Sequence, residues 1–146
     1  MSRFRRLSDT VFASPQIAVD DIAEAGSAGV TLIINNRPEG ESDDQTPGPA
    51  IEAAARAAGL DYIAIPVGGA GFGEPQVAAM ANALADARGK VLAYCRSGTR
   101  STLLWSLAQA RAGHDPDAIA AAAADAGYDV APVRPAMDML AAAARG

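Results

Sequence analysis

Short apolar runs alternate with longer helix-like segments along this chain, and the alternation limits the folds that it can adopt. Strand-like runs are expected over residues 31–35, 62–67 and 91–94, with a further strand or hairpin over residues 7–14. Helix patterns are expected over residues 19–28, 47–58, 74–88, 99–112, 117–126 and 135–144. Strands separated by helices form βαβ units, so this order predicts an α/β domain with a mostly parallel sheet.

The size and composition are those of one globular domain. The chain has 146 residues, of which 50% are hydrophobic and 20% are charged, so it is long enough to bury a core. No repeat or linker divides it, and we expect a single domain over residues 1–146. The net charge of −5 argues against nucleic acid as a partner.

The sequence also favours a cytoplasmic protein. No apolar run approaches the ~20 residues that a membrane span needs, and no apolar segment follows the basic start in the manner of a signal peptide. The single cysteine permits no internal disulfide and fits a reducing compartment. No cluster of His and Cys residues indicates a metal site, and we expect no cofactor.

The single cysteine, Cys95, lies in a loop suited to nucleophilic chemistry on an anion. The loop reads Cys95-Arg96-Ser97-Gly98-Thr99-Arg100-Ser101 and joins an apolar strand to a helix. Gly98 allows the backbone to curl. The helix that follows directs free N–H groups and a positive dipole end toward the sulfur, and such surroundings favour a reactive thiolate.

The alternative interpretation is that Cys95 is a small buried hydrophobic residue, as isolated cysteines commonly are. That interpretation leaves the two arginines and the glycine turn without explanation, so we favour the functional one.

Three loops are expected to border one crevice. Cys95 follows one strand, the glycine-rich residues 68–73 follow another, and Arg37 lies just after a third. Ligands of open α/β sheets bind at the carboxyl ends of the strands, so these segments belong together there.

Several stretches of the chain, including Ala93-Tyr94-Cys95-Arg96-Ser97-Gly98-Thr99-Arg100-Ser101, resemble one family. The others are residues 14–17, 19–22, 33–38 and 62–67. Together they are similar to the phosphatase-like domain of β-lactamase-hydrolase-like proteins, a bacterial branch of the cysteine-dependent phosphatase fold. The resemblance implies a three-layer structure, with a mainly parallel central sheet flanked by helices and the Cys95 loop around an oxyanion.

The Cys95 loop departs from the pattern of cysteine phosphatases. Those enzymes carry Cys-x5-Arg, often with His before the cysteine, whereas four residues separate Cys95 from Arg100 here and Tyr94 comes first. The shorter loop looks like that of rhodanese sulfurtransferases. Phosphatases also use an Asp general acid, and the equivalent stretch offers only Glu74, which also reads as an ordinary first-turn helix residue.

These features lead to three alternatives for the function. The first is a cysteine-dependent sulfurtransferase with a persulfide on Cys95, a small anionic sulfur donor and an external thiol as acceptor. The second is a phosphatase that hydrolyses phosphoesters through a cysteinyl-phosphate, and the third is an anion-binding module without turnover. The missing acid and the shorter loop favour the first.

The expected roles follow from position in the loop. Cys95 is the nucleophile and Arg100 is the anion clamp. The N–H groups of residues 97–99 (Ser97, Gly98 and Thr99) line the anion site. Arg96 either meets the anionic donor or is a solvated charge.

Two further residues each have two interpretations. Ser101 either hydrogen-bonds the thiolate or is an ordinary first-turn residue. Arg37 either enters the crevice to bind the anion or forms an ion pair with Glu39 or Glu41.

Overall fold

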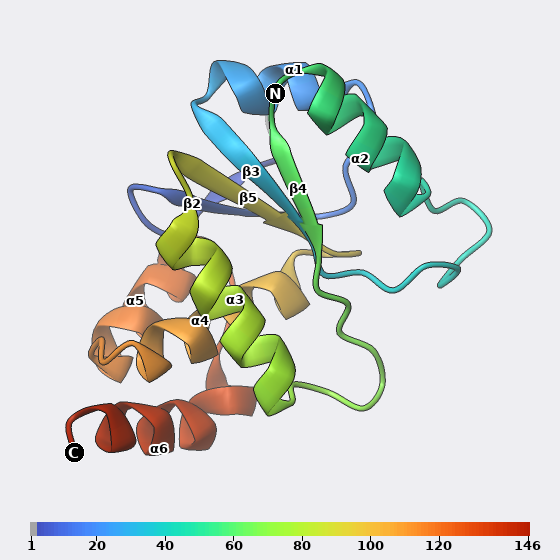
Figure 1. Cartoon of the computed structure of the whole chain (residues 1–146). Helices are drawn as coiled ribbons and strands as arrows, with labels where there is room; N and C mark the ends of the chain where they lie inside the picture. Colours follow the sequence, from blue (N-terminus) through green and yellow to red (C-terminus); the bar gives the residue numbers. More distant parts are fainter. Residues whose placement is uncertain (1–2) are drawn as a thin grey trace.

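In the computed structural model, which describes residues 3–146, a five-stranded sheet lies between two layers of helices (Figure 1). The spatial order of the strands is β1-β2-β5-β3-β4. Only β1 runs antiparallel to its neighbour, and the other strands are parallel. The strands are β1 (Arg5–Arg6), β2 (Val11–Ser14), β3 (Val30–Asn35), β4 (Asp61–Ala64) and β5 (Lys90–Tyr94). The expected α/β class, with a mostly parallel sheet flanked by helices, is confirmed.

One face of the sheet is covered by α1 (Asp21–Ser27) and α2 (Gly48–Ala57) (Figure 1). Ile22 and Ile51 from these helices join the core formed with Ile33 and Leu92 of the central strands. Alternate residues of a strand point to opposite faces. An irregularity in the pairing of β3 with β5 lies between Val30 and Leu32, and there the alternation shifts by one residue.

The other face carries four helices: α3 (Glu74–Asp86), α4 (Thr99–Arg111), α5 (Pro116–Asp125) and α6 (Arg134–Ala144). A short 3₁₀ turn, η1 (Ala131–Val133), leads into α6. Helix α4 packs against α3, α5 and α6 as well as against the sheet. Leu104 and Trp105 are therefore buried on a helix that is covered on most of its sides, and even its polar Ser101, Thr102 and Ser106 are buried.

Two elements end two or more residues earlier than their sequence patterns predict. Strand β4 stops at Ala64 instead of Val67, because Pro66 has no N–H to donate to a ladder. The N–H groups of Ile65 and Val67 still bond to the carbonyls of Asn35 and Asn36. Helix α3 stops at Asp86 because Ala87 has an extended conformation.

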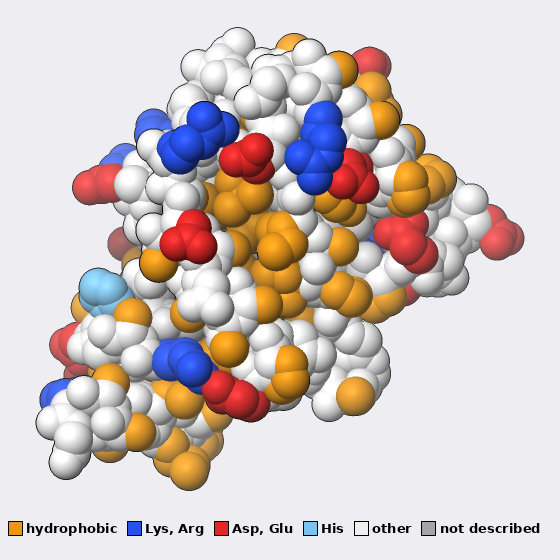
Figure 2. Space-filling model, in the orientation of Figure 1, with side chains coloured by type: hydrophobic (Ala, Val, Ile, Leu, Met, Phe, Trp, Pro, Cys, Tyr) orange, Lys and Arg blue, Asp and Glu red, His pale blue; other side chains and the backbone are white. Residues whose placement is uncertain are grey.

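The surface charges and the helix lengths bear on nucleic acid and membrane, the two partners that the sequence argues against. Figure 2 shows acidic and basic side chains interspersed around a hydrophobic area on one face. Within residues 3–146, no helix has the length and apolar character that crossing a membrane requires.

Candidate active site

Cys95 follows β5 directly and lies between that strand and the start of α4. Its side chain is fully buried, and its N–H donates to the carbonyl of Ser14 at the end of β2. The N–H of Gly98 donates to the Cys95 sulfur at 3.1 Å. The sulfur therefore accepts a hydrogen bond from the loop and lies near the positive end of the 13-residue helix α4.

The backbone conformation and the close neighbours at position 98 both require glycine. It has φ +90°, a left-handed conformation that side chains rarely adopt. A Cβ at this position would collide with the hydroxyl of Tyr128 and lie 3.3 Å from the carbonyl carbon of Ser14. Glycine at this position thus lets the loop pack closely while its N–H faces the sulfur.

Hydrogen bonds between Ser97 and Thr99 stabilise the outer side of the Cys95 loop. The Ser97 hydroxyl accepts a hydrogen bond from the N–H of Thr99 at 3.3 Å and lies 3.0 Å from the Thr99 hydroxyl. The N–H of Thr99 is thus engaged within the loop, and its expected role in lining the anion site stays a prediction. Gly98 supplies the N–H that reaches the sulfur, and the role of the Ser97 N–H stays a prediction.

Arg100 bridges the Cys95 loop to the acidic loop formed by residues 36–47. Its two terminal nitrogens, Nη1 and Nη2, form a bidentate pair with the carboxylate of Glu41 at 2.7 and 2.8 Å. Nη1 also donates to the carbonyl of Val67 after β4, at 2.8 Å. The pKa of Arg100 is raised, mainly by the hydrogen bond with Glu41 and to a lesser degree by the charge of Cys95. Arg100 thus lies close to both the nucleophile and a carboxylate.

Arg37 is buried and bonded to protein groups on every side of its guanidinium. Nε donates to Glu41 at 2.9 Å, Nη1 to the side chain of Gln16 and Nη2 to the hydroxyl of Ser42, both at 3.0 Å. Its side chain is only 4% exposed. The structure therefore places Arg37 in the ion pair with Glu41, which is the second of its two interpretations, and direct binding of the anion by Arg37 stays a prediction.

Glu41 accepts hydrogen bonds from both arginines, and its pKa falls to about 2. The hydrogen bond from Arg100 is the largest cause, burial opposes it, and Arg37 adds to the lowering. Asp44 lies on the same loop and also has a lowered pKa, mainly because the Ser42 hydroxyl donates to it. Both carboxylates are therefore ionised at neutral pH.

Ser101 and Asn36 form a buried polar pair beneath the loop. The Ser101 hydroxyl donates to the side-chain carbonyl of Asn36 at 2.8 Å, and the Asn36 amide donates to the carbonyl of Ile65 at 3.0 Å. The hydroxyl proton of Ser101 is thus donated to Asn36, and a hydrogen bond from Ser101 to the thiolate, one of its two interpretations, stays a prediction. The pair fixes the start of α4 against the end of β3.

The remaining candidates are Arg96 and Glu74. Arg96 is exposed, and its positive charge is among the minor causes of the lowered pKa of Asp44. Glu74 pairs with Arg111 across α3 and α4, as a first-turn surface residue does. In the described residues, no group of three or more His, Cys, Asp or Glu side chains could hold a metal ion.

The sequence pattern does not predict the roles of two residues of the site. It offers Glu41 only as a partner of Arg37, whereas the structure shows that Glu41 also holds Arg100. The hydroxyl of Tyr128 donates to the carbonyl of Ser97 at 3.2 Å, and its ring lies 6.0 Å from the guanidinium carbon of Arg5. No local pattern marks it, because it reaches the loop from the segment after α5.

Solved structures share this fold over nearly the whole chain. A crystal structure of a candidate phosphatase from Neisseria meningitidis has a TM-score of 0.83 and 29% sequence identity, covering 96% of this chain and 99% of that one. A second candidate phosphatase, from Shewanella putrefaciens, has a TM-score of 0.75 and 22% identity over 100% and 95% of the two chains. TpbA of P. aeruginosa, solved with pTyr, has a TM-score of 0.68 and 18% identity over 99% and 91%. The last two show similarity of fold alone.

Curated relatives with similar sequences identify the family. The beta-lactamase hydrolase-like protein of Xylella fastidiosa is 37% identical over 103 residues, which cover 70% of this chain and 24% of the relative. The protein of the same name from Agrobacterium fabrum is 38% identical over 104 residues, covering 71% and 24%. The matched part is thus about a quarter of each relative's length. Since residues 3–112 also match the family model, the chain belongs to the family of phosphatase-like domains of beta-lactamase hydrolase-like proteins.

Proposed function

We propose that this domain transfers sulfur through Cys95, from an anionic donor to an external acceptor. The observation that carries the proposal is the bidentate contact of Glu41 with Arg100 of the Cys95 loop, which holds the Glu41 carboxylate in its ionised form. Glu41, which contacts Arg100, has a pKa of about 2, and the pKa of Asp44 is also lowered. A carboxylate that remains ionised at neutral pH is a poor proton donor.

Phosphoester hydrolysis needs such a donor. When a thiolate attacks phosphorus, the departing oxygen takes up a proton, and a positioned acid typically contributes about 10²–10⁴ in rate. Glu74, the candidate that follows the glycine-rich loop, is paired with Arg111 on the outer surface. The site geometry therefore favours a reaction whose leaving group needs no proton.

Sulfur transfer is such a reaction. The Cys95 thiolate attacks the outer sulfur of the donor, the S–S bond of the donor breaks, and the leaving group departs with the electron pair. The leaving group is a thiolate or sulfite and is stable as an anion. The Gly98 N–H and the Arg100 guanidinium stabilise the negative charge near the sulfur.

The second half of the reaction requires a partner. Cys95 is the only cysteine of the 146 residues, so no other thiol of the chain can remove the outer sulfur. An external thiol, or cyanide in an assay, attacks that sulfur and returns Cys95 to its thiolate form.

Phosphatase activity is the second candidate, and similarity to known proteins supports it more directly than it supports sulfur transfer. The matching family is phosphatase-like, and the candidate phosphatase of N. meningitidis is 29% identical. In this alternative, Cys95 forms a cysteinyl-phosphate, and phosphotyrosine, the ligand of TpbA, is a reasonable first substrate to try.

Intact-mass spectrometry with separate donors tests the proposal. Incubation with an organic persulfide should add about 32 Da, one sulfur atom, to the wild type. Cyanide should remove the adduct, and Cys95→Ser should not form it. Release of phosphate from aryl phosphates, with no sulfur adduct from any donor, would reject sulfur transfer and favour the second candidate.

A further inference from the structure

We infer that Glu41 determines specificity by limiting the negative charge that the Cys95 loop accepts, so that singly charged organic persulfides react in preference to doubly charged donors. The inference rests on the proposed sulfur transfer and concerns the class of donor. It starts from the contact between Glu41 and Arg100, which changes the charge of the anion clamp.

The carboxylate of Glu41 occupies one edge of the Arg100 guanidinium. Both carboxylate oxygens accept from Arg100, at 2.7 and 2.8 Å, and the Val67 carbonyl takes a further N–H. A guanidinium binds tetrahedral oxyanions best through two parallel N–H groups. Three of its five N–H groups are already used, so Arg100 has a reduced capacity to surround an oxyanion.

Glu41 is held in this position from its other side. Buried Arg37 donates to the same carboxylate at 2.9 Å, and the backbone N–H of Glu41 donates to the side chain of Gln45 at 2.9 Å. Its side chain is 26% exposed. The negative charge is therefore a fixed part of the site.

Arg37 and Arg100 contribute two positive charges, and ionised Glu41 contributes one negative charge. In the thiolate form that the proposed reaction requires, Cys95 adds a second negative charge, so the charges of these four groups then cancel before any donor binds. A singly charged donor leaves one excess negative charge, and a doubly charged donor leaves two. Each added charge a few ångströms from Glu41 is repelled, and water at this partly exposed site reduces the effect to roughly tenfold per charge.

Organic persulfides meet this limit, whereas thiosulfate and phosphomonoesters carry a second negative charge. In the favoured reaction, the Cys95 thiolate forms a bond to the outer sulfur of R–S–S⁻. The S–S bond of the donor breaks and R–S⁻ leaves with its electron pair. One anion enters and one anion leaves, so the reaction needs no oxidant or reductant.

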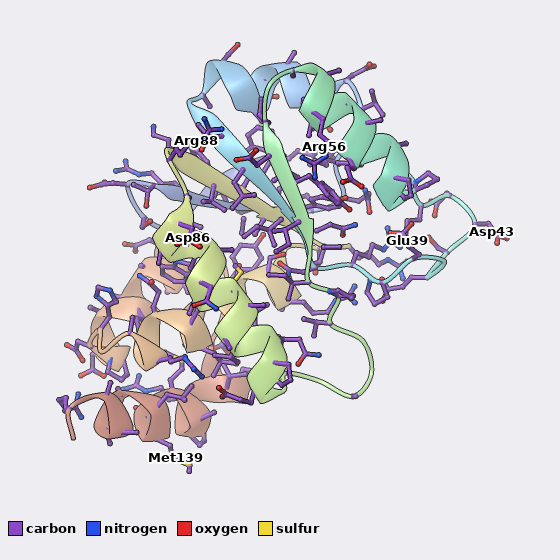
Figure 3. All side chains as sticks on the ribbon, in the orientation of Figure 1. Glu39, Asp43, Arg56, Asp86, Arg88 and Met139 are labelled. Carbon is purple, nitrogen blue, oxygen red and sulfur yellow. The ribbon has the colours of Figure 1, made fainter. Side chains whose placement is uncertain are left out.

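The test compares the rates of sulfur-adduct formation from a small organic persulfide and from thiosulfate. The full chain is used as wild type, as Glu41→Gln and as Asp43→Asn. Asp43 lies on the same loop and points outward (Figure 3), so Asp43→Asn removes one charge without touching Arg100. The ratio of the persulfide rate to the thiosulfate rate should fall roughly tenfold in Glu41→Gln and stay unchanged in Asp43→Asn.

The affinity for inorganic anions gives a second test, which does not depend on a reaction at Cys95. Calorimetry compares sulfate with nitrate on Cys95→Ser, with and without Glu41→Gln. Since a dianion is repelled twice as strongly, loss of Glu41 should raise the affinity for sulfate by roughly the square of the gain for nitrate. Equal gains, or none, would overturn the inference.

Different results would contradict the charge inference at Glu41 and the proposed sulfur transfer. If Glu41→Gln slows both donors by the same factor, Glu41 only positions Arg100 and the charge inference is wrong, while the Cys95 adduct still supports sulfur transfer. If the wild type forms no adduct from either donor, the proposed function itself is wrong. Thermal unfolding of each variant checks that differences in folding do not cause the change in ratio.

Discussion

The Cys95 loop and the acidic loop of residues 36–47 meet at Arg100 but are built differently. The Cys95 loop is short and fixed between β5 and α4, and its glycine is required by a conformation and a close contact. The acidic loop joins β3 to α2 without regular structure, and side-chain hydrogen bonds such as those of Arg37 and Gln45 hold it. The comparison shows that one loop carries the nucleophile while the other sets the charge around it.

The largest effect is expected at the nucleophile. Cys95→Ser should abolish both the sulfur adduct and turnover, because a hydroxyl is far less nucleophilic than a thiolate at neutral pH. Mass spectrometry and a thiosulfate-to-cyanide assay measure this. Residual turnover above a few per cent of wild type would mean that the acidic loop, or another group, carries the chemistry.

Arg100→Lys should slow transfer by roughly 10- to 100-fold. An ammonium cannot reproduce the planar fork that joins Glu41 and Val67, so the two loops lose their shared contact. Arg111→Lys on the same helix is the matched control, because the ion pair of Arg111 within residues 3–146 is with surface Glu74. Similar rates for both variants would show that the two loops are not coupled through Arg100.

Gly98→Ala should lower the free energy of unfolding by about 1–3 kcal/mol, since it combines a positive φ with a collision against Tyr128. Denaturant unfolding measures the loss. Tyr128→Phe in the same chain removes the colliding hydroxyl and should recover part of it. Gly40→Ala is the control in the acidic loop: it also has positive φ but no neighbour within 4 Å of a Cβ. Equal losses at both glycines would contradict the difference in packing between the loops.

How well the sequence predicts each region depends on how local its determinants are. The strand, glycine turn and helix around Cys95 are contiguous in the sequence, so a local pattern predicts this loop. The alternation of strands and helices likewise predicts the parallel sheet. The bonds of Arg37 and Ser101 depend on which loops the sheet order brings together, as the contact of Arg100 with Glu41, 59 residues away, shows. Tyr128 reaches Ser97 across 31 residues, and no periodicity encodes such a contact.

A smaller effect is expected in the pH dependence of stability. The pKa of Glu41 is lowered from 4.5 to about 2 in the fold. Its contribution is therefore complete above about pH 4.5 and is lost as the pH falls through about 2. Solvent screening at the 26% exposed side chain limits it to about 1–2 kcal/mol.

Unfolding of the wild type and Glu41→Gln, measured from pH 7 to pH 2, tests this contribution. The wild type should lose more stability than the variant between pH 4.5 and pH 2. Parallel curves would mean that the acidic loop does not hold an ionised carboxylate against Arg100.

A competition for Cys95 tests the central claim most directly. The wild type is mixed at neutral pH with equal concentrations of an organic persulfide and an aryl phosphate, and the mass of the intact chain is followed with time. The account predicts an adduct of about 32 Da that cyanide removes, because Glu41 and Asp44 of the acidic loop remain ionised. An adduct of about 80 Da on Cys95, the mass of a phosphoryl group, together with steady release of phosphate and no sulfur adduct, would contradict it.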